Sequence, residues 1–171
     1  MKRNFTLYFK GLKIMAFSKN FVGNNVKVEI ADAPADGGLA TSFTTLEHLS
    51  AFPAAAGIET NMVTIQVFGE QYVQKVPGSR SVPDLTLSVV WRPGAVGQEK
   101  LAAAQISGNL IQVKVTYFEN MADANGAAYY SVVNGYVGSS TPNGGFDTIT
   151  TRDFVVNVVG GPVAQGETLG E

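Results

Sequence analysis

The chain contains no cysteine among its 171 residues. This absence excludes a disulfide framework, a thiolate metal site and a cysteine nucleophile. It fits assembly in a reducing cytoplasm, although many exported proteins also lack cysteine. Histidine is nearly absent, because His48 is the only one, so a Ser-His-Asp relay or a multi-histidine metal site would depend on it. No recognisable nucleophile elbow accompanies His48, and we interpret it as a structural or surface residue.

Long hydrophobic runs and organised acidic pairs are also missing. No window approaches the roughly 18 apolar residues that a membrane span needs. The acids are scattered, with no pair in a pattern that indicates a general acid and base. The glycine pairs at residues 37–38, 144–145 and 160–161 are not followed by a helix with Lys-Ser or Lys-Thr, so no phosphate cradle is expected. We therefore expect neither an enzyme nor a cofactor or metal site.

Charge is scarce and unevenly distributed. Charged residues make up 15% of the chain, and the formal net charge is −2. Half of the 12 basic residues precede the first acid, Glu29, whereas from Val28 onward 14 acids stand against 6 bases. The predicted folded body is thus acidic, which argues against ordinary nucleic-acid binding through basic patches. An acidic body remains compatible with a surface along which DNA slides without sticking.

The basic N-terminal part, residues 1–25, is expected to be an arm outside the domain. It is a poor match to a signal peptide, because Lys10 and Lys13 interrupt the apolar stretch and no small-residue cleavage site follows. Met15 opens a second natural-looking start, so residues 1–14 are either an over-extended start or flexible, or they form a docking arm.

The remaining composition favours strands and turns. The chain has 19 glycines, 7 prolines and many short apolar runs, as in a β-rich fold. Turn signals stand at residues 125–126 and 141–145. Residues 44–49 fit either a short helical turn or a strand edge, residues 69–83 are expected to be a long excursion between two strands, and residues 161–171 a C-terminal tail. The strands are expected at residues 26–31, 62–68, 84–91, 110–118, 127–137 and 148–159.

The most informative stretch covers residues 84–106, where the hydrophobic period changes at Pro93-Gly94. Before this pair, Leu85, Leu87, Val89 and Trp91 face one way and are expected in the core, whereas Asp84, Thr86 and Ser88 face the other way. After the pair come good helix formers, including three alanines. The stretch predicts a strand, a tight corner and a helix, and it carries no catalytic motif.

Residues 90–101 resemble the major tail tube protein of lambda-like long-tailed bacteriophages, the siphophage tail tube family. The resemblance continues through the order of elements over residues 59–162. The motif residues are Trp91, Pro93, Gly94, Gly97, Gln98 and Leu101.

This resemblance implies a mainly β fold: a small antiparallel β-sandwich or barrel over residues 26–160, flanked by one short α-helix, with a long inter-strand loop and extended termini. It also implies a structural protein of the virion tail that is assembled in the host cytoplasm. Six copies would form a ring, and stacked rings would form a tube for DNA delivery. The implied partners are further copies of the chain, the tape-measure protein, the tail terminator and tail-tip proteins, with DNA passing unbound and no membrane involved.

Two sets of residues are the candidate sites. The polar strand faces would line the lumen and repel phosphate, unless they are simply a solvated sheet face. The excursion at residues 69–83 would stack one ring on the next through a mixed apolar and basic set, unless it is an ordinary loop. The lumen candidates are Asp84, Thr86, Ser88, Thr64 and Gln66, and the stacking candidates are Tyr72, Val73, Lys75, Val76 and Arg80.

Three other functions stay open at this stage. One is an exported β-sandwich that binds carbohydrate or acts in adhesion. Another is a tail terminator or connector, which caps a tube and does not polymerise. The third is the secreted tube of a bacterial injection system. Electron microscopy of the purified protein separates tubes from single rings and monomers.

Overall fold

The computed structural model describes residues 23–53, 57–122 and 127–168. The expected N-terminal arm therefore lies almost wholly outside the described residues, and so does the turn signal at residues 125–126. Within the described ranges the chain forms nine strands and one helix. They are β1 (Val26–Asp32), β2 (Thr44–Leu46), β3 (Glu59–Ile65), β4 (Gln74–Ser81), β5 (Leu85–Val90), α1 (Val96–Ser107), β6 (Ile111–Phe118), β7 (Ala128–Asn143), β8 (Thr151–Val158) and β9 (Ala164–Thr168).

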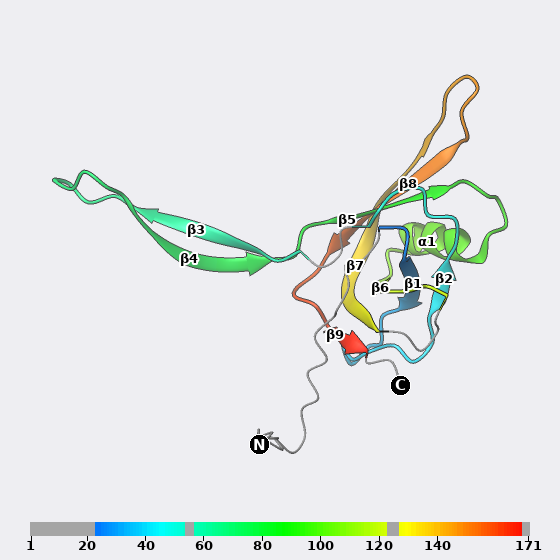
Figure 1. Ribbon diagram of the computed structural model, residues 1–171, viewed down its shortest axis with the longest axis horizontal. Helices are drawn as coiled ribbons and strands as arrows, with labels where there is room; N and C mark the ends of the chain where they lie inside the picture. The colour runs from blue at the N-terminus through cyan, green and yellow to red at the C-terminus, as the bar shows by residue number, and fades with distance from the viewer. Residues whose placement is uncertain (1–22, 54–56, 123–126, 169–171) are drawn as a thin grey trace, which may run out of the picture.

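Seven of the strands form one antiparallel sheet in the order β2-β1-β6-β7-β8-β5, with β9 paired to β7 (Figure 1). The sheet curls, and its two ends approach each other just after β2. There a bridge joins Leu49 to Val89, and the Val90 N–H donates to the His48 carbonyl at 2.8 Å. The result is a half-barrel with α1 packed against it. The expected mainly β, antiparallel fold with one short helix is confirmed.

The core fills the inside of this curl. Alternation along β5 buries Leu85, Leu87 and Val89, and the same alternation along β8 buries Phe154 and Val156. The helix adds Leu101, which is fully buried in the same cluster. Because β1, β6 and β7 also turn valines and isoleucines inward, one continuous core holds the sheet and the helix together.

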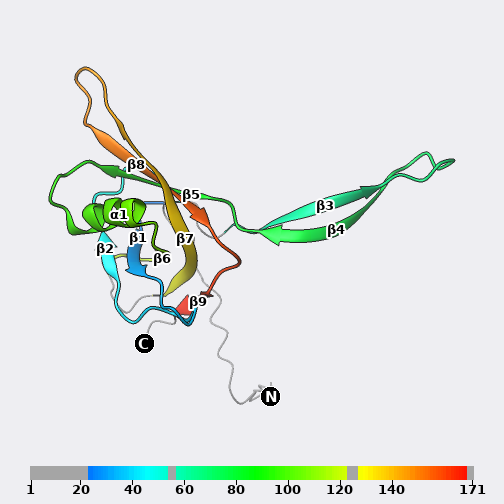
Figure 2. The ribbon, with the colours of Figure 1, turned by 180° about the vertical axis from the view of Figure 1, so that it is seen from behind.

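Two hairpins project from this body in different directions (Figures 1 and 2). One is the separate two-stranded sheet of β3 and β4. We call this hairpin the arm, and it is distinct from the expected N-terminal arm at residues 1–25. Every residue of its two strands is exposed. The other is the outer part of β7 and β8, where Asn143 pairs with Thr151 and residues 144–150 turn between them. We call this segment the β7–β8 tip.

The arm corrects the expected long loop over residues 69–83, because most of this range is strand β4. The residues that suggested a loop, Pro77 and Gly78, lie where the pairing register shifts between Thr60 and Met62. A β-bulge of this kind, on a ribbon whose outer edges are unpaired, tolerates proline and glycine in a strand.

Other boundaries also differ from expectation. Strand β7 continues past its expected end at residue 137 and reaches Asn143, inside the expected turn at residues 141–145, because β8 pairs with it along this extension. Part of the expected C-terminal tail forms β9, which pairs with β7 from Ala128 to Val132. The ambiguous residues 44–49 form β2 followed by the bridge to β5.

Trp91 was expected in the core, and this was wrong. The side chain is 42% exposed. Strand β5 ends at Val90, and the Trp91 N–H donates to the Thr150 carbonyl at 3.0 Å, at the rim of the half-barrel. Alternation predicts which side of the sheet a side chain takes only within the strand, and Trp91 lies one residue past the end of β5.

Candidate functional site

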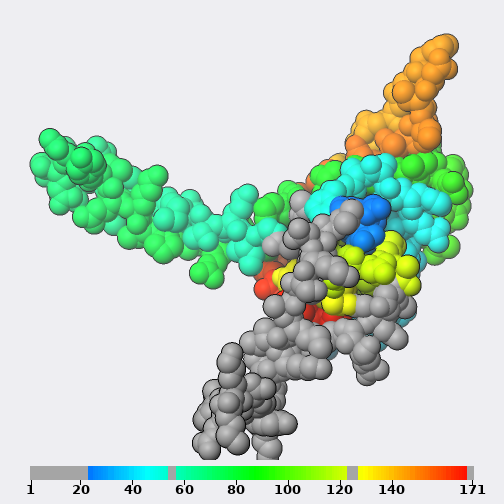
Figure 3. All heavy atoms as spheres, viewed as in Figure 1, coloured from blue at the N-terminus to red at the C-terminus, as the bar shows by residue number. Residues whose placement is uncertain are grey.

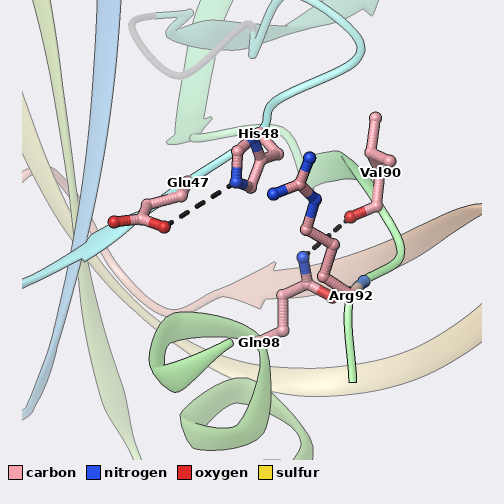
Figure 4. Close-up of polar contacts among 5 residues, drawn as sticks. All are labelled: Glu47, His48, Val90, Arg92 and Gln98. Carbon is pink, nitrogen blue, oxygen red and sulfur yellow. Dashed lines mark hydrogen bonds and ion pairs between the residues drawn. The ribbon is translucent and has the colours of Figure 1, made fainter. Parts of the chain in front are cut away.

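The corner between β5 and α1 is held by the side chain of Gln98, which is only 3% exposed. Its Nε2 donates to the Val90 carbonyl at 2.9 Å, and its Oε1 accepts from the Arg92 N–H at 3.1 Å (Figure 4). Gly94 has φ 88°, a conformation that side chains other than glycine rarely adopt. The glutamine thus satisfies two backbone groups left by the end of β5 and ties the helix to the strand.

Gly97 allows α1 to lie directly against β2. A Cβ atom at this position would stand 2.8 Å from the Thr45 carbonyl oxygen and 3.2 Å from the Leu46 Cα. One turn later, Leu101 enters the core. The motif residues at this corner therefore act in packing and in backbone geometry, which is a structural role.

His48 also has a structural place at this corner. Its Nε2 lies 3.8 Å from Glu47 Oε2, and its backbone has φ 60° where the chain turns from β2 towards β5 (Figure 4). Within residues 23–53, 57–122 and 127–168, no group of three or more His, Cys, Asp or Glu side chains is arranged to hold a metal ion. In the same ranges, no helix has the length and apolar character to cross a membrane.

The solvent-facing side of β5 and β8 forms a polar surface. Thr86 and Ser88 pair with Val155 and Asp153 across the two strands, so these side chains share one face. Asp84 extends this face at the start of β5: its carboxylate accepts from Asn157 Nδ2 at 2.7 Å and from the Val158 N–H at 3.2 Å. We call this surface the polar face; its members are Asp84, Thr86, Ser88, Asp153, Val155 and Asn157.

Sequence reasoning missed the contribution of β8 to the polar face. Asp153 and Asn157 alternate with the buried Phe154 and Val156, and this period-2 pattern was a usable signal. The pattern alone could not show that β8 lies beside β5, because the two strands are separated by α1, β6 and β7 in the chain. Arg152 alternates onto the core side, where its Nε donates to Ser140 Oγ at 2.6 Å.

The other two lumen candidates lie elsewhere. Thr64 is on the arm, opposite Lys75, and Gln66 directly follows β3. Within one chain the structure therefore brings together Asp84, Thr86 and Ser88, and it places Thr64 and Gln66 on a different, projecting element.

The arm has two chemically different faces. Val63 pairs with Val76, and Ile65 follows on the same face; these three side chains are 48%, 42% and 43% exposed respectively. The opposite face is mixed, because it carries the pair Thr64–Lys75 and, next to it, the pair Met62–Pro77. Tyr72 and Val73 lie just before β4, and Arg80 pairs with Thr60 near the base. An apolar ribbon face of this kind, without cover from the described part of its own chain, marks an interaction surface.

No protein-family model matches this sequence, and no curated protein sequence matches it. Solved structures do. The SPP1 tail tube protein is 14% identical, with a TM-score of 0.59 over 89% of this chain and 80% of that chain. A chain of the gene transfer agent (GTA) tail, refined with C6 symmetry, is 13% identical, with a TM-score of 0.58 over 87% and 98%. A chain of the PVC sheath-tube complex, from an extracellular contractile injection system, is 12% identical, with a TM-score of 0.61 over 90% and 94%.

The chain has the tail tube fold. The expected resemblance to tail tube proteins is confirmed at the level of fold. In this tail tube fold Gln98 and Gly97 fix the helix, and Leu101 fills the core.

Proposed function

We propose that this chain is a structural protein that polymerises as stacked hexameric rings into a phage tail tube. The observation that carries the proposal is the arm on a tail tube fold. Its apolar face, Val63, Ile65 and Val76, contributes nothing to the core of its own chain. A two-stranded ribbon with exposed apolar side chains and free edges becomes stable when another copy covers it.

Six-fold assembly is supported by what related folds do. The GTA tail was refined with C6 symmetry, and the anti-feeding prophage (AFP) baseplate, a chain of which matches with a TM-score of 0.61 at 6% identity, was six-fold symmetrised. A ring of identical copies needs a head-to-tail interface between two different surfaces of each copy. The body of this chain and the hairpins that project from it offer different surfaces of this kind.

In the proposed tube the polar face lines the channel. Its two charged side chains, Asp84 and Asp153, are both carboxylates. Carboxylates on a channel wall repel phosphate and keep DNA from binding as it passes to the host. Thr64 and Gln66 also line the channel if the arm of a neighbouring copy lies along it.

The arm is proposed as the ring-stacking element. Its candidate residues combine apolar side chains with two bases, whereas the body from Val28 onward is acidic. Opposite charges across such a contact set the register of stacking more than they set its strength. The stacking residues are Tyr72, Val73, Lys75, Val76 and Arg80.

The other proposed partners follow from the tube: the tape-measure protein, the tail terminator, the tail-tip proteins and DNA that passes without specific binding. The proposed location is the virion tail, after assembly in the host cytoplasm, and the proposed role is not enzymatic. The PVC match favours one alternative, the tube of an injection system. An AFP tube-terminating cap also matches, with a TM-score of 0.57, which keeps a terminator role as a second alternative.

The experiment removes the arm and leaves the body. Replacing residues 60–80 with Asn-Gly keeps the Glu59–Ser81 pair and closes it with a tight two-residue turn. We expect a folded monomer, because no residue of the arm belongs to the core, and we expect no tubes in negative-stain microscopy. Wild-type protein should give long tubes with a central channel.

A milder variant separates the apolar face from the rest of the arm. Val63→Ser together with Ile65→Ser and Val76→Ser should preserve the arm and prevent stacking. Thr64→Ser, on the opposite face, is the matched control and should form tubes. Normal tubes from the arm deletion would contradict the stacking role, whereas single rings from wild-type protein would favour the terminator.

A further inference from the structure

We propose that the β7–β8 tip of one copy docks into a depression at the β5–α1 corner of a neighbouring copy. The proposal rests on the proposed function, since it assumes that copies of the chain assemble. It assigns a second inter-subunit contact, separate from the arm, and it names both halves of that contact on this chain. The donor half is the pair Phe146 and Asp147, which we call the knob.

The knob is almost entirely uncovered. The Phe146 side chain is 97% exposed, and nearby Ile149 is 74% exposed. The turn that carries them has a defined shape: the Thr148 N–H and hydroxyl both donate to the Gly145 carbonyl, and Asp147 has φ 60°. Figure 3 shows the tip standing out from the body. An exposed aromatic side chain at the end of a projecting hairpin is typical of an interaction surface.

The receiving half is a depression of about 230 Å³ beside the corner, which we call the socket. Its size suits a phenyl ring, because an apolar cavity of about 150 Å³ already holds benzene. The half-exposed Trp91 indole offers an aromatic surface for that ring. The residues that line the socket are Trp91, Arg92, Pro93, Gly94, Gln98, Glu99, Ala102 and Arg152.

The charges of the knob and the socket are complementary. Two arginines, Arg92 and Arg152, are among the residues that line the socket, and neither forms an ion pair with a carboxylate in the part of the chain that the structure describes. Arg152 is stacked towards the Trp91 ring at 6.0 Å from its centroid. One carboxylate, Glu99, also lines the socket, so its net charge is positive. The Asp147 carboxylate of the knob supplies the matching anion next to the aromatic ring.

The knob cannot use the socket of its own chain. The Trp91 N–H donates to the Thr150 carbonyl, which fixes the base of the hairpin at the edge of the socket. Pairing of Asn143 with Thr151 then directs the turn away from the body, and the exposure of Phe146 shows that it does not fold back. A knob and a socket on different surfaces of one chain make a head-to-tail contact, and repeated head-to-tail contacts close into a ring.

Swapping the charges of Asp147 and Arg92 tests whether the knob of one copy contacts the socket of another. Asp147→Arg and Arg92→Asp should each lower the tube fraction that sediments about tenfold, because each places like charges together. The double variant restores opposite charges and should recover to within about threefold of wild type. Neither site belongs to the core, and Arg92→Asp keeps the backbone N–H that Gln98 binds. Glu167→Arg makes the same charge change on β9 and should form tubes normally.

Cross-linking gives an independent test, because the chain has no cysteine of its own. Ile149→Cys chains, which keep both knob residues, and Ala102→Cys chains are mixed in equal amounts, assembled and oxidised. We expect a disulfide-linked dimer that Ile149→Cys does not form with Glu167→Cys, on β9. Tubes without this specific dimer, or single charge variants that assemble normally, would overturn the docking and leave the tube intact. The dimer without tubes would support the docking while contradicting the proposed function, and the absence of both would overturn both.

Discussion

Replacing Gln98 with methionine tests the architectural role of the corner directly. Methionine keeps the length and volume of glutamine, so packing beside Leu101 is preserved while both hydrogen bonds are lost. Each such bond contributes about 0.5–1.5 kcal/mol net, and the backbone partner at Arg92 can reach water. The expected loss is therefore about 2 kcal/mol in the free energy of unfolding. For a chain of this size that corresponds to a decrease in Tm of about 4–8 °C.

The assay is equilibrium urea unfolding of the unassembled chain, followed by fluorescence of the single tryptophan, Trp91. Gln105→Met is the matched control, since Gln105 lies on the same helix and its side chain makes no hydrogen bond among the described residues. If Gln98→Met and Gln105→Met differ by less than about 0.5 kcal/mol, a surface-like effect, the corner is not held by this side chain.

The remaining predictions concern two close backbone contacts and the channel. Gly97→Ala should destabilise the chain by about 1–3 kcal/mol in urea unfolding, despite the better helix propensity of alanine, because its Cβ would stand 2.8 Å from the Thr45 carbonyl oxygen. Gly135→Ala should cost a similar amount, since a Cβ there would lie 2.7 Å from the Asn157 carbonyl oxygen; a stability equal to wild type would show that β7 and β8 separate easily. Ser88→Lys should leave folding and tubes unchanged but make tubes retain short duplex DNA at low salt, measured by co-sedimentation; equal retention by wild-type tubes would contradict a lumen position.

Much of the fold could be predicted from the chain alone. The change of period at Pro93-Gly94 predicted the strand, corner and helix, because alternation and helix propensity are local properties. The alternation of Leu85, Leu87 and Val89 predicted their burial correctly. The absence of cysteine and the single histidine exclude thiol chemistry and multi-histidine metal sites from the sequence alone.

Which distant segments lie side by side could not be predicted from the sequence in the same way. The polar face needs β5 beside β8, and the knob and socket need the hairpin base beside Trp91; each arrangement joins residues about sixty or more apart in the chain. Only the curl of the sheet decides these neighbours. The loop-like composition of Pro77 and Gly78 was misleading for the same reason, since a bulged ribbon accepts them once β3 is available as a partner.

The sequence by itself thus determined which side chains are apolar, where the period changes and which chemistries are excluded. The tertiary structure decided which faces meet. It moved Trp91 from the expected core to the rim, placed Thr64 on the arm and exposed Phe146 at the end of a hairpin. The physical reason is that local patterns set the conformation and sidedness of a segment, whereas burial depends on what the rest of the chain brings against it.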